Sequence, residues 1–550
     1  MFSGDLLNPD SFMRLVRLQD TLAAGRPVYI VMRDGGGGTL LHWSHFLDSF
    51  LLLLALPLRV FLPWPAALHG AAVAFGPLCI GCVGVAVAWA MAPLSLPGWR
   101  WTAPALAAMA PPVVGYAFPG VVHHHVPLGL AGVMMAGAAG RLAAGARGAG
   151  WTLGAAAAAG IWLSPEDMPL VLLAFGGGGL AWLVRPGVPG IGAGLAAAGS
   201  ALLLLVSAAY AVDPPYAGYA AVEIDRLSIV YLGLGVAVCA IGWALWSLDR
   251  LGLARPWRGL LGGTIGIGGI LLWIACFPRV ILGTEGLDNA ADAAAMNALV
   301  QEMLPVGSWP EAMALLFGGL LALLLLLWLA VSRRSLLWAY AAACVGLMLA
   351  LGLLHIRFST YPALAAACCL PVAVTEITRR LANHSPVLLP IARVGLLAVA
   401  MLATRADSLV GGPRKAPESD VAAPACNLRA ATALLAGHAG EVVMSDPSDS
   451  PELLYRSQVH TVGSLYHRNA AAFMRLRRAW RSVAADSVPE AVRATGATLI
   501  LVCPRPSRSL LVADLPPDTL LDRISHGQTP AWLEMVAGDG DGYALYRILP

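Results

Sequence analysis

The sequence predicts an α-helical protein that crosses a membrane many times and ends in a small α/β domain. Hydrophobic residues make up 58% of the 550 residues, charged residues only 12%, and the mean hydropathy is +0.71. A soluble globular domain would carry about 25% charged residues. The formal net charge of +3 gives no indication of nucleic-acid binding. The composition therefore predicts a membrane protein with no nucleic-acid partner.

Apolar runs predict twelve membrane-spanning helices, because one span needs about 17–25 mostly apolar residues. The predicted spans are 69–93, 102–118, 126–145, 149–163, 168–185, 189–212, 227–247, 258–281, 312–331, 335–354, 359–380 and 386–404. Residues 46–63 are also apolar enough to span, but counting them would invert every later helix. We therefore interpret them as a re-entrant or interfacial helix with Asp48 and Arg59 near its ends.

Arginines lie in every second loop between these spans. They are Arg100, Arg141, Arg147, Arg185, Arg250, Arg255, Arg258, Arg333, Arg334, Arg379 and Arg380. Positive residues mark the cytoplasmic side, so the other loops face outward, in a bacterial inner membrane. This orientation predicts three parts: a first external loop with surface helices (1–68), a transmembrane domain (69–404) and an extracytoplasmic C-terminal domain (405–550).

The start of the chain is unusual under this orientation. Residues 1–20 lack the apolar run of a signal peptide, yet they are predicted to lie outside. Either the chain starts outside, or a first membrane helix upstream of Met1 is absent from it. We favour the second interpretation.

The polar tail predicts a small α/β domain. Residues 406–420 (ADSLVGGPRKAPESD) are typical of a linker, residues 441–446, 497–504 and 542–549 of strands, and residues 468–483 and 488–495 of helices. Cys426 and Cys503 are the cysteines of this tail, and an extracytoplasmic location would permit a disulfide between them.

Polar residues of the outward loops are the candidates for chemistry, since polar residues gathered at one membrane face mark substrate paths. Asp10 follows a turn signal and is either a helix cap or a functional carboxylate. Glu302 lies in a long outer loop and is either solvated or functional. In an extended loop His123 and His125 would point the same way and converge on a metal, the alternative being an interfacial histidine cluster without a ligand.

Two further loops hold charged candidates. Arg357, in HIRFSTY, is either a lipid-headgroup anchor or a guanidinium that grips a phosphate through two hydrogen bonds. Glu166 and Asp167, in LSPEDMP, are interpreted as caps of the following helix. The secondary candidates are His124, Glu166, His355, Tyr361, His467 and Arg468.

In their order along the chain these motifs resemble the catalytic subunits of oligosaccharyltransferases, members of the C-type (GT-C) superfamily of membrane glycosyltransferases. NPDSFMRLVRL and residues 27–50 resemble the first external loop with its surface helix, and GYAFPGVVHHHVP the second-loop metal motif. LVQEMLPVGSW resembles the fifth-loop element with its glutamate, and HIRFSTYPAL the Arg-Phe element. The resemblance covers the membrane region and implies thirteen spans in the family, the first of them absent here.

The resemblance implies a site and a reaction. Asp10 and Glu302 would be catalytic, and with His123 and His125 they would hold a divalent metal, while Arg357 would bind the phosphate of a polyprenyl-linked sugar donor. The family implies Mn²⁺ or Mg²⁺, but His123 and His125 stand where it has carboxylates, and imidazole shifts preference toward Zn²⁺. Membrane lipid is the remaining expected partner.

The sequence of the tail does not identify the acceptor. The family's Trp-Trp-Asp element, which reads the acceptor sequon, has no counterpart; residues 446–455 and 464–473 occupy the corresponding region. The alternatives are a glycosyltransferase with a lipid or polysaccharide acceptor, and a transporter or flippase of a lipid-linked substrate. A transporter would tend to show internal repeats, and the sequence shows Gly-rich patches but no repeat.

Overall fold

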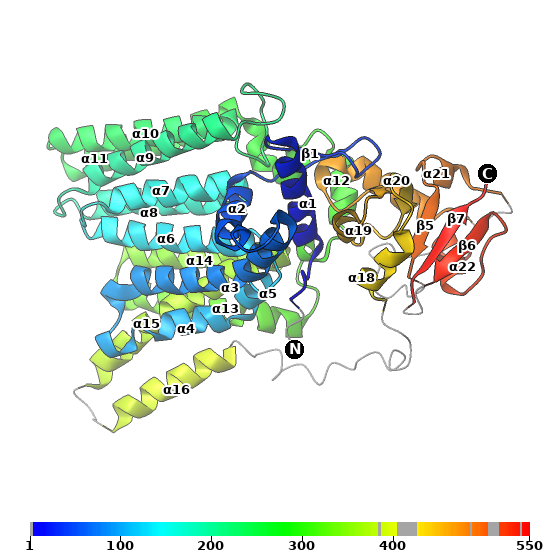
Figure 1. The fold of residues 1–550 in the computed structure, drawn as a ribbon. Helices are drawn as coiled ribbons and strands as arrows, with labels where there is room; N and C mark the ends of the chain where they lie inside the picture. The colour runs from blue at the N-terminus through cyan, green and yellow to red at the C-terminus, as the bar shows by residue number, and fades with distance from the viewer. Residues whose placement is uncertain (1–3, 383–386, 404–425, 484–486, 504–515, 539–541) are drawn as a thin grey trace.

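The computed structural model describes residues 4–382, 387–403, 426–483, 487–503, 516–538 and 542–550. A bundle of long helices fills one end of the molecule and a sheet-containing domain the other (Figure 1). Of the described helices, nine are long and apolar enough to cross a membrane, and two shorter apolar ones lie among them. The molecule is therefore a multi-pass membrane protein, as predicted.

The helices of the bundle follow the predicted spans closely. They are α3 (Trp64–Met91), α6 (His125–Ala143), α7 (Ala149–Leu163), α8 (Met168–Val184), α9 (Ile191–Val212), α10 (Ile229–Arg250), α11 (Arg255–Cys276), α13 (Trp309–Arg333), α14 (Leu336–Leu354), α15 (Thr360–Leu381) and α16 (Leu388–Ala403). Glycines let some of them approach closely: a Cβ on Gly154 of α7 would lie 2.2 Å from the carbonyl oxygen of Ala198 in α9.

The predicted span 102–118 is broken into two short helices, α4 (Thr102–Met109) and α5 (Pro111–Tyr116). Ala110 between them is extended, with φ −67° and ψ 121°. Pro111 explains the break, because proline lacks an N–H and pushes the preceding residue out of helical geometry. Tyr116 consequently ends α5 near the loops at the sheet-domain end of the bundle.

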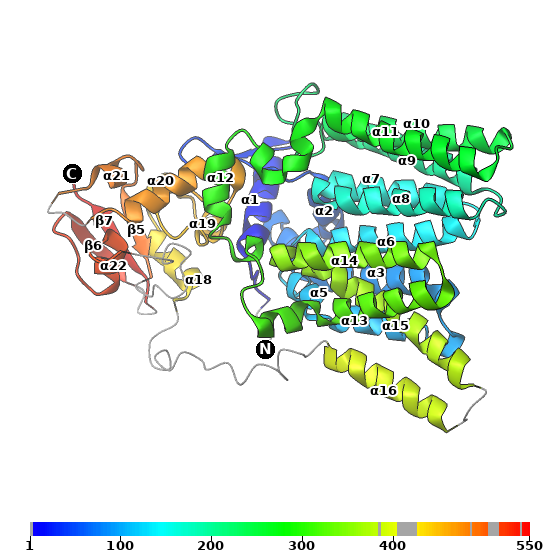
Figure 2. The same ribbon diagram turned by 180° about the vertical axis from the view of Figure 1, so that it is seen from behind.

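The first loop forms α1 (Pro9–Ala24), a hairpin of β1 (Ile30–Val31) and β2 (Thr39–Leu40), and α2 (Phe46–Arg59), the helix expected within 46–63. Helix α1 lies across the ends of the bundle helices, between them and the sheet domain (Figures 1 and 2). Asp48 of α2 forms buried ion pairs with Arg14 and Arg17 of α1, at 2.9 and 2.6 Å. These pairs fix α1 in place.

The C-terminal domain contains a five-stranded sheet with the order β4-β3-β5-β7-β6. Its strands are β3 (Val442–Met444), β4 (His460–Thr461), β5 (Leu499–Val502), β6 (Leu533–Gly538) and β7 (Ala544–Ile548), and its helices are α18 (Leu428–Ala431), α19 (Ser450–Arg456), α20 (Ala470–Trp480), α21 (Glu490–Arg493) and α22 (Leu520–Ser525). Strands β4, β3 and β5 are parallel, and β7 and β6 antiparallel. The three predicted strands and two predicted helices are present; β4, β6, α18, α19 and α22 are additional.

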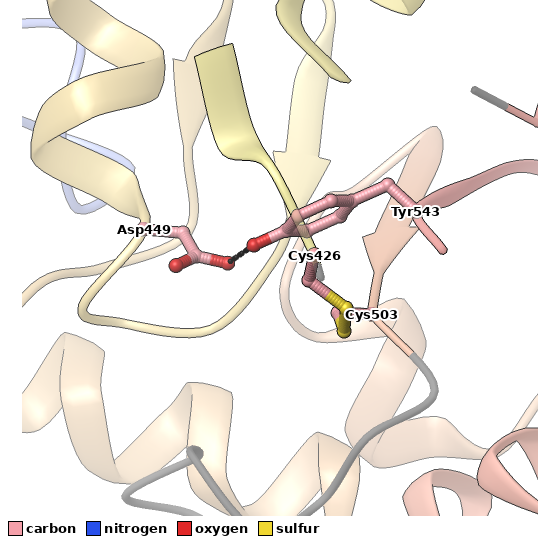
Figure 3. The surroundings of a disulfide bond; sticks show 4 residues. All are labelled: Cys426, Asp449, Cys503 and Tyr543. Carbon is pink, nitrogen blue, oxygen red and sulfur yellow. Dashed lines mark hydrogen bonds between the residues drawn. A yellow bond between two sulfur atoms is a disulfide. The ribbon is translucent and has the colours of Figure 1, made fainter. Parts of the chain in front are cut away.

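A disulfide joins Cys426, at the start of the described domain, to Cys503 after β5 (Figure 3). Beside it the Tyr543 hydroxyl donates a hydrogen bond of 2.9 Å to Asp449. The linker expected at 406–420, and with it the predicted boundary at 404/405, lies outside the described residues. The predicted domain limits remain predictions.

Several contacts hold the C-terminal domain on the bundle. Arg468 pairs with Glu223 and Asp225 of the loop before α10, each at 2.6 Å, and His467 Nε2 lies 2.7 Å from Asp225. Phe12 of α1 lies 5.5 Å from the Tyr455 ring of α19, centroid to centroid. The tail therefore lies directly over the first loop.

Candidate active site

Five loop segments meet at the end of the bundle that faces the C-terminal domain. Asp10 lies in the first turn of α1, which Asn8 caps by accepting a hydrogen bond from Ser11. The histidine run leads into α6, whose first residue is His125. The remaining members lie on single turns of 3-10 helix: Glu166 in Pro165–Asp167, Glu302 in Gln301–Met303 and Arg357 in Ile356–Ser359. Short turns thus carry Glu166, Glu302 and Arg357, whereas Asp10 and the histidine run lie at the first residues of α1 and α6.

The two predicted carboxylates meet at one imidazole nitrogen. His123 Nε2 lies 3.3 Å from Asp10 Oδ2 and 3.8 Å from Glu302 Oε2. His123 is 4% exposed, whereas the Asp10 and Glu302 side chains are 26% and 32% exposed. The cluster of Asp10, His123 and Glu302, hereafter the carboxylate–histidine cluster, is therefore buried on one side and open on the other.

Each carboxylate of this cluster is oriented by a tyrosine. Tyr466, from the C-terminal domain, donates a hydrogen bond of 3.2 Å to Asp10 Oδ1. Tyr116, at the end of α5, donates one of 3.2 Å to Glu302 Oε2. The sequence interpretation did not single out either tyrosine, although Tyr116 lies in the motif GYAFPGVVHHHVP and Tyr466 in residues 464–473. Only the fold shows that they point at the carboxylates.

Glu166 belongs to the site as well as to a helix start. Ser164, not Glu166, caps the 3-10 turn, by accepting a hydrogen bond from the Glu166 backbone N–H. The Glu166 carboxylate pairs with Arg357 and lies 3.9 Å from His124 Nε2. The capping interpretation of Glu166 is therefore wrong for its side chain. Arg357 is therefore linked to the histidine run through Glu166.

The three histidines form a compact group of donors. Each offers a ring nitrogen, and these nitrogens lie within 4.8 Å of one another. Both ring nitrogens of His125 are buried and have no hydrogen-bond partner among the residues that the structure describes. Neutral imidazoles and carboxylates together suit Zn²⁺ as well as the harder Mn²⁺ or Mg²⁺. The three histidine nitrogens therefore fit a divalent ion, and the carboxylates of Asp10 and Glu302 lie beside one of these histidines, His123.

Local electrostatics favour the ionised form of Asp10 and the neutral form of His124. Burial acts to raise the pKa of Asp10, but the hydrogen bond and charge of His123 outweigh it and the pKa is lowered. Burial lowers the pKa of His124, although the Glu166 carboxylate, which accepts a hydrogen bond from His124, acts in the opposite direction. An ionised carboxylate and a neutral imidazole are the protonation states that ligate metals.

The other predicted residues lie around the cluster or beyond it. His355 Nδ1 lies 2.7 Å from the carbonyl oxygen of Met303, next to Glu302. Tyr361, in α15, is buried, as is Asp167, whose carboxylate oxygens have no hydrogen-bond partner in the described part of the chain. His467 and Arg468 bind Asp225 at the domain junction. None of these groups has a contact with Asp10 or Glu302 among the interactions of the described residues.

No family model matches the chain. No curated protein sequence matches it either. Its fold is similar to that of solved structures of an archaeal oligosaccharyltransferase, and this confirms the resemblance at the level of the fold.

The solved protein concerned is the archaeal oligosaccharyltransferase AglB from Archaeoglobus fulgidus. Its complex with an inhibitory peptide and a dolichol-phosphate aligns with a TM-score of 0.62 and 13% identity, over 90% of this chain and 65% of that one. The form tethered to an acceptor peptide with the NVT sequon gives 0.65 and 12%, over 91% and 65%. The complex with Zn and sulfate gives 0.62 and 12%, over 90% and 64%. The chain thus spans about two thirds of AglB.

Proposed function

We propose that this chain is a membrane glycosyltransferase that moves a sugar or oligosaccharide from a polyprenyl-phosphate or polyprenyl-pyrophosphate donor to an acceptor at the outer face of the membrane. The observation that carries the proposal is the convergence of Asp10 and Glu302 on His123 Nε2, at 3.3 and 3.8 Å, from three loops far apart in the sequence. Polar clusters of this kind at a membrane face mark substrate sites. The AglB fold supports the reaction class.

The residues of the site divide into two groups by charge. Asp10, His123 and Glu302, with His125 or His124 beside them, would hold a divalent ion. When bound, the ion would supply positive charge to stabilise a phosphate leaving group. That AglB has been solved with Zn is in keeping with this donor set.

Arg357 is the group of the chain that would bind the donor's phosphate. Its guanidinium is largely buried and is held toward the histidines by Glu166. A guanidinium presents several N–H donors in a plane and matches phosphate oxygens. Arg357 would thereby orient the donor and stabilise charge on the departing oxygen.

The two tyrosine-bound carboxylates would act on the acceptor. Tyr116 and His123 both lie against Glu302 Oε2, so Glu302 Oε1 would accept a proton or hydrogen bond from the acceptor. Asp10, with Oδ1 bound by Tyr466 and Oδ2 beside His123, would act through its negative charge. Tyr466 comes from the C-terminal domain, so this domain helps to shape the acceptor side. The acceptor's class, whether protein, lipid or polysaccharide, is read from the product.

Comparing cells with and without the gene tests the proposal. Mass analysis of glycopeptides and glycolipids is expected to show one product that depends on the gene. Product on peptide indicates an oligosaccharyltransferase, and product on lipid or polysaccharide the other acceptor class. No change in any glycan would contradict the proposal and favour transport of a lipid-linked substrate.

A substitution ties that product to the site. Glu302→Gln should lower transfer by about 10²–10³-fold, because loss of one electrostatic contact to the transition state commonly has that effect. Glu285→Gln is the matched control, since Glu285 is an exposed carboxylate of the same loop. Near-normal turnover by folded, purified Glu302→Gln protein would contradict the role of Glu302.

A further inference from the structure

A cluster of arginines lies at the opposite end of the bundle from the carboxylate–histidine cluster. Glu376, near the end of α15, pairs with Arg333, Arg379 and Arg380 at 2.6, 2.5 and 2.9 Å. Arg393 of α16 donates hydrogen bonds of 2.9 and 2.6 Å to the Thr378 hydroxyl. We call Arg333, Glu376, Arg379, Arg380 and Arg393 the arginine cluster. The distribution of arginines assigns this end to the cytoplasm.

The arginine cluster carries more positive charge than its carboxylate can neutralise. It holds four guanidinium groups and one carboxylate, a surplus of three positive charges. Glu376 is only 8% exposed, whereas the side chains of Arg333, Arg379 and Arg380 are 43%, 54% and 50% exposed. The buried carboxylate therefore holds the guanidinium groups at the surface, where they present free N–H donors to an anion.

An apolar groove opens at this cluster. Its volume is about 410 Å³, and it lies among α13, α15 and α16, with α4 and α5 along one side. Trp328, Glu376 and Arg380 line it at the cluster end, and Ala403 and Pro112 at the other. Arg380 lies 4.3 Å from the centroid of the Trp328 ring. Apart from the two charged groups, its lining is apolar.

Small side chains create this groove. Gly318 and Ala322 of α13 and Ala366 and Ala373 of α15 are among its lining residues. Helix α16 contributes one buried residue only, Ala403, and lies at the edge of the bundle (Figure 1). The volume falls in the range of about 300–1,000 Å³ typical of ligand sites. A slender apolar chain therefore fits between α16 and the bundle better than a protein helix does.

We propose that an anionic phospholipid binds here, with an acyl chain in the groove and its phosphate against Arg379 and Arg380. Two observations support a phospholipid as the occupant: the groove is apolar along its length, and the charge at its mouth is positive. Basic pockets between membrane helices on the cytoplasmic side are suited to acidic headgroups. The phosphate would lie at the end of the bundle away from Asp10 and Arg357, so this lipid is distinct from the proposed sugar donor. The lipid would fill the groove between α16 and the neighbouring helices, against which α16 is loosely packed.

Lipid titration of the purified full chain tests the proposal. Native mass spectrometry should show one bound palmitoyl-oleoyl phosphatidylglycerol that survives at concentrations where phosphatidylcholine does not bind. The double variant Arg379→Gln/Arg380→Gln should bind phosphatidylglycerol about thirtyfold more weakly. Each arginine near an anionic lipid surface contributes about 1 kcal/mol, and about 1.4 kcal/mol corresponds to a tenfold change in affinity. Ala373→Phe should weaken binding while keeping every charge, because the ring enters the groove.

A matched control separates the cluster from general positive charge. Arg147→Gln/Arg250→Gln removes two exposed arginines from the same end of the bundle and should leave lipid binding unchanged. Equal binding of the two lipids to the unmodified chain would overturn the proposal, and this comparison needs no variant to fold. Equal weakening by the control pair would overturn it too. Displacement of the lipid by inorganic phosphate at the same concentration would show that the groove contributes nothing.

Discussion

The Asp10 and Glu302 carboxylates are positioned through their hydrogen-bond partners. Tyr466 and Tyr116 each fix one oxygen, and His123 lies against both groups. Because Tyr466 comes from the C-terminal domain and Tyr116 from α5, the geometry depends on three parts of the fold. A change in either tyrosine should therefore disturb the reaction without removing a charge.

We expect Tyr116→Phe and Tyr466→Phe each to lower the transfer rate by about tenfold, because a hydrogen bond to a charged group contributes about 1.5–3 kcal/mol and part of this is recovered by water. Measured kcat with a saturating lipid-linked donor tests this. Tyr216→Phe is the control, since Tyr216 is an exposed tyrosine of an outer loop. If both variants turn over like the control, the tyrosines do not position the carboxylates.

Arg357→Lys should raise the KM for the lipid-linked donor by about tenfold and lower kcat as well, since an ammonium group loses the planar two-point contact with phosphate. Steady-state kinetics with varied donor concentration measures both effects. Arg279→Lys changes an exposed arginine paired with Asp288 and serves as the reference. An unchanged KM together with unchanged kcat would remove Arg357 from the phosphate site.

Among the structural elements, the disulfide between Cys426 and Cys503 has the clearest energetic consequence. It closes a segment with a sequence separation of 77 residues. Restricting a loop of that length in the unfolded chain corresponds to about 4 kcal/mol. The bond therefore contributes a large part of the stability of a small domain.

Cys426→Ser/Cys503→Ser should accordingly lower the free energy of unfolding of the C-terminal domain by about 4 kcal/mol. Denaturant unfolding followed by near-ultraviolet circular dichroism is the measurement, with reductant-treated unmodified protein as a second sample. Cys82→Ser, which removes an exposed free cysteine, is the control. Coinciding unfolding curves for the double variant and the control would mean that the bond contributes nothing.

The sequence predicted the helices better than the breaks and the short strands. Long apolar runs gave the spans because a membrane helix must satisfy its backbone internally over about 20 residues. The break at Ala110 follows from Pro111. The span prediction counted apolar residues and did not take this proline into account. Strand β4 has only two residues, His460–Thr461, and β6 lacks alternation, so tertiary pairing alone defines them.

The residues of the site were predictable from their common sidedness, and their partners were not. Arginines in alternate loops placed Asp10, His123 and Glu302 on one face, and the structure brings them together. Glu166 was interpreted as a cap because Ser-Pro-Glu is a helix-start signal, which Ser164 satisfies here. Which of two plausible uses a loop carboxylate takes depends on residues far away in the chain, in this case Arg357.

For the molecule as a whole, the contact between the C-terminal domain and the bundle decides whether the site is complete. Asp225 is the centre of that contact, paired with His467 and Arg468. Burial acts to raise the pKa of Asp225, but its hydrogen bonds with His467 and Arg468 prevail, and the pKa is held below its ordinary range. The ionised carboxylate therefore stabilises the assembly above the unfolded pKa of about 4, and this contribution is lost as the pH falls further.

The thermal stability of the unmodified protein should accordingly stay level from about pH 7 to about pH 5 and decrease below about pH 4. The Asp225→Asn variant should already be about 2 kcal/mol less stable at neutral pH, and its stability should depend less on acid. Calorimetric unfolding at a series of pH values compares the two proteins. Asp288→Asn, at a carboxylate that is 92% exposed, controls for loss of charge. Parallel pH profiles for Asp225→Asn and the unmodified protein would show that Asp225 does not anchor the domain.

Metal content tests the central claim most directly, because the account requires Asp10, His123 and Glu302 to form one ligand set. After equilibration with Mn²⁺ or Zn²⁺ and dialysis, the purified protein should retain one ion per chain by elemental mass spectrometry. Asp10→Asn, His123→Ala and Glu302→Gln should each lose most of it, whereas His526→Ala, at an exposed histidine, should retain it. Equal metal content in all five proteins, or none in the unmodified one, would contradict the account.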